Sequence, residues 1–186
     1  NRPNSEGGKN ELQVWTTTVT VGGSTPAPQP TPTPEPAGPN LYIEAEDFDS
    51  AANLAPFSVI NDSAASAGKA LSWPNDGSDA TDTTPADSDS GQVAYSFGLA
   101  DLAPKIEVFI RVDAPTGFDD SVYVKMVGQD ASWIQKNGLR TSGYQWKSVG
   151  SYFNVPAGDY AFTILKREDG IKIDRIYIST DGTPPH

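Results

Sequence analysis

Three acidic residues in two distant segments have the types and spacing of a cation site. Glu44 and Glu46 are two residues apart in a segment with a strand pattern, so their carboxylates should leave the same face and converge. Side by side and unpaired, they would repel each other. Asp174 and backbone carbonyls could complete the coordination of a calcium ion if the first and last strands are neighbours. We therefore expect a structural Ca²⁺ that fastens the two ends of the domain together.

Two other interpretations of the glutamate pair stay open. Glu44 and Glu46 could form a solvent-exposed charge pair. They could also be the two carboxylates of a glycosidase, which face each other across a cleft. A strand close to a linker is a poor position for such a cleft, so calcium binding is the favoured interpretation.

Other kinds of catalytic chemistry lack their residues. The sequence has no cysteine, which excludes disulfides, thiol nucleophiles and thiolate zinc sites. Its one histidine is His186, the last residue, where a chain is usually frayed. A Ser-His-Asp triad therefore has no suitable base.

The charge balance argues against two classes of partner. Acidic residues outnumber basic ones 24 to 13, which gives a formal charge of −11. Phosphate backbones and anionic lipid would repel such a chain, so we expect no nucleic-acid or membrane partner. Local basic residues can still override the net charge, and Arg111, Lys136, Arg140 and Arg167 are candidates.

Short strand patterns separated by turn residues fill the sequence from Asn40 to Thr180, and no helical period accompanies them. This pattern predicts an all-β domain, an antiparallel β-sandwich of the jelly-roll kind. The expected strands are 41–48, 69–73, 91–99, 105–114, 120–128, 131–136, 145–155, 158–168 and 171–180.

The chain divides into four parts by composition. Residues 22–39 alternate Pro with Thr, Ala, Gln and Glu, which predicts an extended Pro/Thr-rich linker. Residues 1–21 contain one isolated strand pattern, which we interpret as the tail of a preceding domain or a stray strand. Residues 40–180 are the sandwich and 181–186 a C-terminal tail. Pro/Thr spacers of this kind are typical of secreted bacterial polysaccharide-degrading enzymes, although a generic solvated linker has the same composition.

An acidic loop interrupts the strand pattern at 75–91. It holds five aspartates and no basic residue, and its Asp, Gly, Pro, Ser and Thr predict a long surface loop. Calcium could bind there, but a solvated loop explains the same composition.

The first and last strand patterns resemble those of carbohydrate-binding module families 6 and 35. YIEAEDFDS at 42–50 and REDGIKIDRIYIST at 167–180 carry the resemblance, which spans nearly all of 40–180. It implies a jelly-roll sandwich, a structural calcium held by residues matching Glu44, Glu46 and Asp174, and ligand binding in the loops at one end. Further matching segments are SWPNDGS at 72–78, IRVDAP at 110–115, DDSVYV at 119–124, YQWKSV at 144–149 and VPAGDYAFTI at 155–164.

A sugar site pairs an aromatic platform, which covers the apolar face of a pyranose, with polar groups that meet its hydroxyls. Trp73 is the first candidate platform, because it directly precedes Pro74 and two short polar residues, although packing at the rim of the sandwich would equally explain it. Trp133 is the second candidate. Trp146 is expected in the core. The polar candidates are Asn75, Asp76, Asp119 and Arg167, although Asx turns and salt bridges would equally explain the last two.

We therefore expect a non-catalytic carbohydrate-binding module, excised from a larger carbohydrate-active enzyme, that targets a linked catalytic domain to a polysaccharide. The module should be secreted, bacterial and monomeric. The alternative is a structural or adhesin-type β-sandwich of a bacterial surface protein, with its tryptophans buried. A small lyase or hydrolase is disfavoured, because no cluster of Tyr with Arg or Lys is visible on one strand face.

Overall fold

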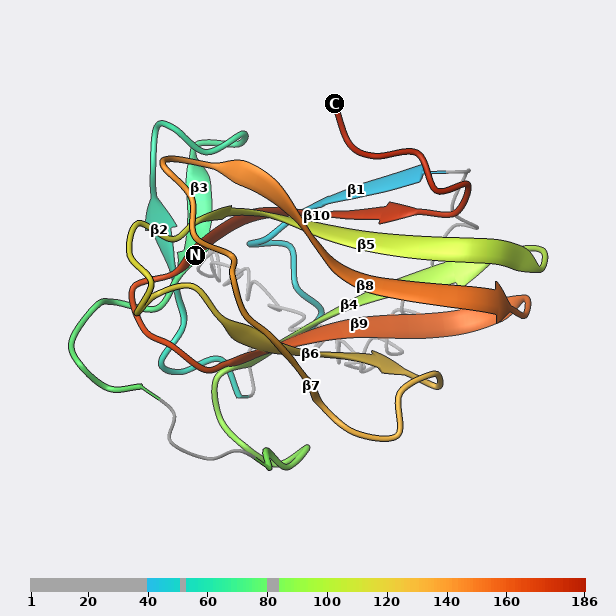
Figure 1. The fold of residues 1–186 in the computed structure, drawn as a ribbon, viewed down its shortest axis with the longest axis horizontal. Coiled ribbons are helices and arrows are strands. Elements are labelled where there is room, and N and C mark those ends of the chain that lie inside the picture. The colour runs from blue at the N-terminus through green and yellow to red at the C-terminus, as the bar shows by residue number, and fades with distance from the viewer. Residues whose placement is uncertain (1–39, 51–52, 80–83) are drawn as a thin grey trace, which may run out of the picture. The chain divides into compact units, whose positions relative to one another are not determined.

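The computed structural model describes residues 40–50, 53–79 and 84–186, which form two facing β-sheets (Figure 1). The predicted linker and N-terminal strand lie outside these residues. One sheet contains β1 (Asn40–Glu44), β2 (Ser58–Asn61), β3 (Lys69–Ser72), β5 (Ala103–Asp113), β8 (Gln145–Val155) and β10 (Lys172–Ser179). The other contains β4 (Gln92–Leu99), β6 (Val122–Val127), β7 (Ile134–Lys136) and β9 (Gly158–Lys166).

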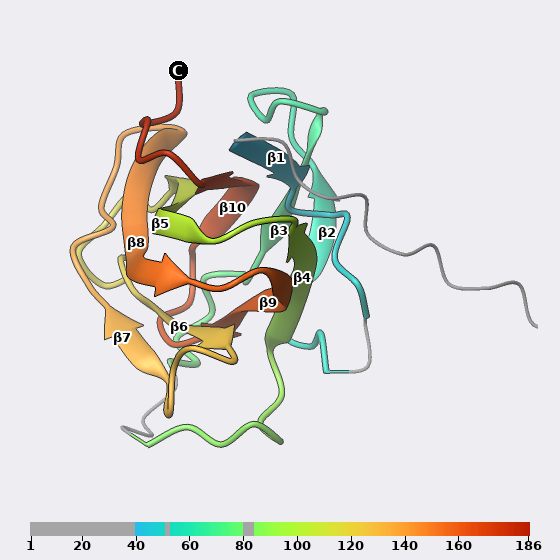
Figure 2. The same cartoon turned by 90° about the vertical axis from the view of Figure 1, so that its right-hand side faces the viewer.

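All strand pairs are antiparallel, which confirms the predicted antiparallel β-sandwich. The six-stranded sheet has the order β2-β3-β10-β5-β8, with β1 also paired to β10, and the four-stranded sheet has the order β4-β9-β6-β7. Figure 2 shows the two sheets as separate layers. No helix able to cross a membrane occurs within the described residues.

Alternation along the strands builds the core between the sheets. In β5, Ile106, Val108, Ile110 and Val112 are fully buried, whereas the residues between them are only half-buried. Side chains two apart share a face, so one face of β5 packs inward and the other lies on the outer surface. Val122, Val124 and Met126 of β6 meet this core from the facing sheet, together with Phe162 and Ile164 of β9.

The predicted strands agree with the observed ones to within two residues except at three places. One is the strand predicted at 131–136, of which only Ile134–Lys136 is a strand. The first strand ends at Glu44 instead of residue 48, because the chain turns after it. The short strand β2 was not predicted. Its four residues lie at the edge of the sheet and are mostly exposed, so they carry no hydrophobic alternation.

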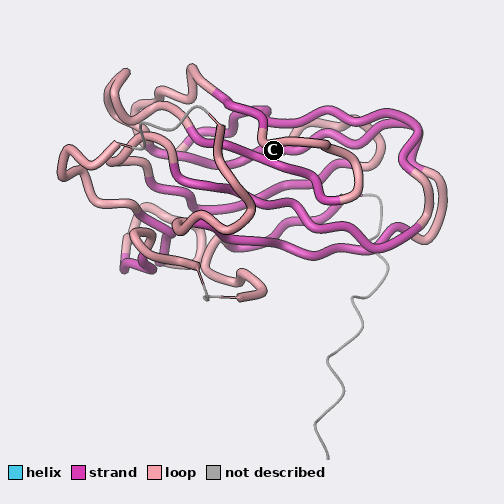
Figure 3. The backbone as a smooth tube through the Cα atoms, turned by 90° about the horizontal axis from the view of Figure 1, so that it is seen from below, coloured by secondary structure: helices cyan, strands magenta, loops and turns pink. Residues whose placement is uncertain are grey.

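The connections gather at the two ends of the sandwich (Figure 3). The β3–β4, β5–β6, β7–β8 and β9–β10 connections lie at one end, which we call the loop end (left in Figure 1). The described parts of the acidic segment 75–91 contain no strand, in agreement with the predicted loop.

Candidate functional site

Trp73, the first predicted platform, is buried and cannot present its ring to a ligand. Only 1% of the residue is exposed, and its ring packs edge-on against Phe57, with 6.3 Å between the ring centres. The Trp73 backbone N–H donates a hydrogen bond to the Ile171 carbonyl, and the Trp73 carbonyl accepts one from the Gly170 N–H. These bonds extend the pairing of β3 with β10 by one residue. The prediction was wrong because Trp73 shares the inward face of Leu71, two residues before it.

Two of the predicted polar residues are exposed, but the third is buried. Asn75 and Asp76 lie on the surface of the loop end, whereas only 1% of Asp119 is exposed. Asp119 accepts hydrogen bonds from the Asn75 side chain (2.9 Å) and from the backbone N–H and hydroxyl of Thr116 (3.0 and 2.7 Å). Its ligand role was therefore wrong, because turn formation occupies its carboxylate.

Arg167 also joins loops. Its guanidinium pairs with Glu168 at 2.5 Å and donates hydrogen bonds to Ser121 and to Asn137. These contacts tie the β9–β10 turn to the two neighbouring loops. The salt-bridge interpretation of Arg167 is the one that the geometry supports.

Trp133, the second predicted platform, is half-buried and lies directly before β7 on the four-stranded sheet. Lys125 Nζ lies 5.9 Å from the centre of its ring and pairs with Asp87 at 2.9 Å. The role of Trp133 in ligand binding stays a prediction.

The predicted metal ligands are only partly brought together. Glu44 and Asp174 both accept a hydrogen bond from the Ser66 hydroxyl, at 2.5 and 3.0 Å. Each also pairs with an arginine: Glu44 with Arg175 at 2.8 Å, and Asp174 with Arg111. Among the described residues, no group of three or more acidic or histidine side chains could hold a metal ion.

Glu46 differs from the other two carboxylates. It lies in the turn after β1, so the expectation that it shares a strand face with Glu44 was wrong. Its Oε2 atom is buried and has no hydrogen-bond partner among the described residues. A buried carboxylate oxygen without a partner is unfavourable, and it is the feature of this region that favours a bound cation.

Aromatic side chains cover the outer surface of the six-stranded sheet. Tyr42 on β1, Tyr177 on β10 and Phe109 on β5 are paired in register across three strands. Trp146 on β8 lies two residue pairs further along, opposite Arg111. We call this surface, together with Tyr144, the aromatic face.

The aromatic side chains of this face contact one another. Tyr177 is only 2% exposed, because two neighbouring rings cover it. The ring centres of Tyr42 and Trp146 lie 4.4 and 6.1 Å from the centre of the Tyr177 ring. The ring centres of Tyr42 and Trp146 are 6.0 Å apart, although β10 and β5 lie between the strands that carry them. Tyr42 is 39% exposed and Trp146 half-buried, so both offer ring surface to solvent on a supported base.

Polar groups border the aromatic face near the loop end. The Tyr144 hydroxyl donates a hydrogen bond to Asp62 Oδ2 (3.1 Å), and Lys172 Nζ pairs with the same oxygen (3.0 Å). Burial and the Asp62 hydrogen bond raise the pKa of Tyr144. The backbone N–H of Ala64 and then Lys172 lower the pKa of Asp62, which therefore stays ionised. The Arg111 guanidinium lies 5.2 Å from the Tyr144 ring centre.

Sequence reasoning missed Tyr42, Phe109 and Tyr177, and placed Trp146 in the core. The missed signal is an aromatic residue that alternates with charged ones. Phe109 lies between Glu107 and Arg111 in period two, and Tyr177 is two residues from Arg175. An aromatic residue on a charged strand face is at the surface. Trp146 is there too, because it pairs with outward-facing Arg111.

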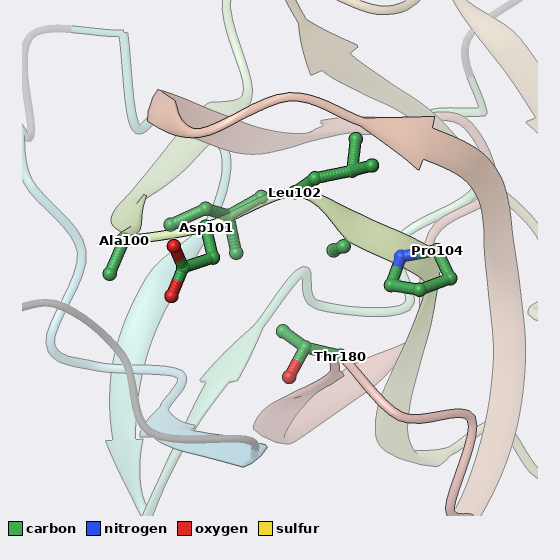
Figure 4. Close-up of a pocket in the computed structure, with 7 residues that line it drawn as sticks. Ala100, Asp101, Leu102, Pro104 and Thr180 are labelled. Atoms are coloured by element: carbon green, nitrogen blue, oxygen red, sulfur yellow. The ribbon is translucent and has the colours of Figure 1, made fainter.

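A small pocket of about 190 Å³ lies at the other end of the sandwich, beside the β4–β5 turn (Figure 4). Leu99–Pro104 and Thr180 line it, and the Leu102, Pro104 and Thr180 side chains are drawn around it. It has no aromatic side chain, so it offers no platform for a sugar ring.

Comparisons with known proteins agree at the level of fold. No protein-family model and no curated protein matches the sequence. Among solved structures, the chain is similar to the C-terminal CBM6 of LamC, a marine laminarinase from Zobellia galactanivorans, with 20% identity and a TM-score of 0.50. The match covers 75% of this chain and 98% of that one.

Two larger proteins contain a similar domain. A ruminal GH26 endo-β-1,4-mannanase matches 81% of this chain with 12% identity and a TM-score of 0.54. The mosquito-larvicidal Cry4Aa toxin from Bacillus thuringiensis matches 75% with 10% identity and a TM-score of 0.51. The match spans 28% and 23% of those chains. The described part of this chain therefore has a β-sandwich fold like that of family 6 carbohydrate-binding modules.

Proposed function

We propose that this chain is a non-catalytic carbohydrate-binding module that holds a polysaccharide on its aromatic face. The observation that supports this proposal is the pair Tyr42 and Trp146, which offer ring surface above the buried Tyr177. A pyranose presents an apolar C–H face to such rings. Asp62 and Lys172, fixed beside Tyr144, supply an acceptor and a donor for hydroxyl groups at the border of the face.

The support beneath these rings favours binding over a purely structural role. Tyr177 is covered by its neighbours, whereas Tyr42 and Trp146 keep ring surface exposed above it. Trp133 also keeps part of its surface exposed, whereas the alternative of a structural domain requires its tryptophans to be buried. A preorganised aromatic surface loses little conformational entropy when a ligand binds.

The proposal includes a targeting role in a secreted enzyme. The fold match to the mannanase spans less than a third of that protein, so a domain of this fold occurs there within a longer chain. A Pro/Thr-rich linker at 22–39 would tether the module to a catalytic domain, and tethering raises the effective concentration of the enzyme at its polymer. We expect a monomer without turnover of its own.

We also propose a structural Ca²⁺ near Glu44, Glu46 and Asp174. The buried, unpartnered Oε2 atom of Glu46 supports it, and the ligands would be carboxylate and carbonyl oxygens. The ion would neutralise Glu46 and fasten the turn after β1 to the last strand.

Affinity gel electrophoresis of the full chain tests the binding proposal. The gels would contain β-1,3-glucan, β-1,4-mannan, galactan, polygalacturonate or a sulfated galactan. We expect retardation by at least one polymer, and roughly tenfold weaker binding for Trp146→Ala and Tyr42→Ala, about 1.4 kcal/mol per ring. Phe153→Ala, which removes an aromatic residue that is 66% exposed on the same sheet surface but lies seven residues along β8 from Trp146, is the matched control and should bind normally.

Two outcomes would contradict the proposal. One is that no polymer retards the protein. The other is that Trp146→Ala and Tyr42→Ala bind as tightly as the Phe153→Ala control. A reducing-end assay on the same polymers checks the absence of turnover, and new reducing ends in proportion to protein would show an enzyme instead.

A further inference from the structure

An open groove of about 540 Å³ lies at the loop end. Pro115 from the β5–β6 loop forms one side. Residues 140–143 from the β7–β8 loop and Gln145 at the start of β8 form the other. Gln145 lies between Tyr144 and Trp146 in the sequence, so the groove adjoins the chain segment that carries two rings of the aromatic face.

Hydrogen bonds fix the two sides of this groove relative to each other. The Thr141 backbone N–H donates to the Ala114 carbonyl at 2.9 Å, and the Leu139 N–H donates to the Asp120 carbonyl at 2.9 Å. The buried Thr141 hydroxyl accepts from Ala114 N–H (2.9 Å) and donates to the Val112 carbonyl (3.1 Å). The groove is therefore a preformed feature of the fold.

Arg140 is the charged residue of the groove, and its charge is not neutralised there. The described part of the chain has three other arginines, and each pairs with a carboxylate. None of the described residues forms an ion pair or hydrogen bond with the Arg140 guanidinium, and no carboxylate lines the groove. In a chain of net charge −11, Arg140 therefore offers an unpaired positive charge at this groove.

We propose that Arg140 binds an anionic group of the glycan, either the carboxylate of a uronic acid or a sulfate ester. This inference rests on the proposed carbohydrate-binding function and names its ligand class. The planar guanidinium donates two parallel hydrogen bonds to such an oxyanion. Exposed Ser142 and Gln145 beside it supply polar groups for the hydroxyls of the same sugar.

The negative charge of the rest of the chain restricts where an anionic glycan can bind. An anionic polymer is repelled by most of the surface, so only a place without carboxylates can hold its charged groups. A glycan that is bound on the aromatic face and continues past the start of β8 into the groove would bring a charged substituent to Arg140. The aromatic face supplies affinity for the sugar rings, and the groove selects among glycans by charge.

Titration calorimetry of the full chain with matched ligands tests this inference. Oligogalacturonate is compared with its fully methyl-esterified form, and a sulfated galactan oligosaccharide with its desulfated form. The variants are Arg140→Gln and Arg140→Lys. Lys69→Gln is the control, because it removes the same charge at an exposed position outside the groove.

We expect the native chain to bind one charged ligand roughly tenfold tighter than its uncharged form. Arg140→Gln should abolish that preference, Arg140→Lys should retain part of it, and Lys69→Gln should keep it whole. Whether the preference is for the carboxylate or for the sulfate identifies the source of the anion.

The inference is overturned if the charged and uncharged forms bind equally, or if Arg140→Gln keeps the preference. In either case, neutral polymers that bind in a Trp146-dependent way leave the proposed function intact. Absence of binding to every charged and neutral ligand rejects the proposed function, and this inference with it.

Discussion

Replacing Trp73 by alanine separates its observed packing from the platform role that its sequence context suggests. The side chain is 1% exposed and contacts Phe57, and Lys166 Nζ lies 5.1 Å from the centre of its ring. Removing a buried tryptophan costs about 3 to 5 kcal/mol through lost burial and the cavity that remains. For a domain of this size, the melting temperature should fall by about 10 to 15 °C.

The assay measures melting temperature and glycan affinity for Trp73→Ala and Trp146→Ala together. The half-buried Trp146 should cost less stability when removed, but more affinity. Affinity of Trp73→Ala is measured well below its melting temperature, where the folded fraction binds normally. If Trp73→Ala melts like the native chain and yet loses binding, then Trp73 is a ligand contact and the core assignment is wrong.

Three further predictions concern stability. Excess chelator should lower the melting temperature and added calcium should restore it, since a cation at about a hundred times its dissociation constant stabilises by roughly 3 kcal/mol; an unchanged melting curve contradicts the calcium proposal. Gly170→Ala should destabilise more than Gly138→Ala in denaturant titrations. Both residues have positive φ, but a Cβ at Gly170 would lie 2.6 Å from Asp119 Oδ1, whereas one at Gly138 meets nothing within 4 Å. The lowered pKa of Asp62 adds stability that is present above its unfolded value, near 3.9, and lost as the pH falls below it. Raising the pH from 3 to 5 should therefore stabilise the native chain more than Asp62→Asn, and equal gains would contradict this.

Alternation was enough to predict most strands of the sandwich. The strand at 145–155 was predicted with its observed bounds, and β5 within two residues, because buried and outward residues alternate along it. The short edge strand β2 has no such alternation.

The candidate site depends on contacts that no single segment encodes. Tyr42 and Trp146 come within 6.0 Å of each other, between ring centres, across β10 and β5, because both rings pack against Tyr177. Similarly, the pairing of Glu44 with Arg175 follows from the β1–β10 register. Without the order of strands, the sequence could not show that arginines would meet the predicted metal ligands.

The pairing of β1 with β10 also determines how the domain responds to force. Asn40 pairs with Ser179 at one end of a ladder of five residue pairs. A pull that separates these two residues would load the ladder from that end, one hydrogen bond after another, instead of shearing all of them at once. A sandwich stretched between an anchored enzyme and another attachment point would therefore open at its first strand under modest tension. The outward-facing Tyr42 would leave with that strand, so mechanical strain and release of a bound glycan would be coupled.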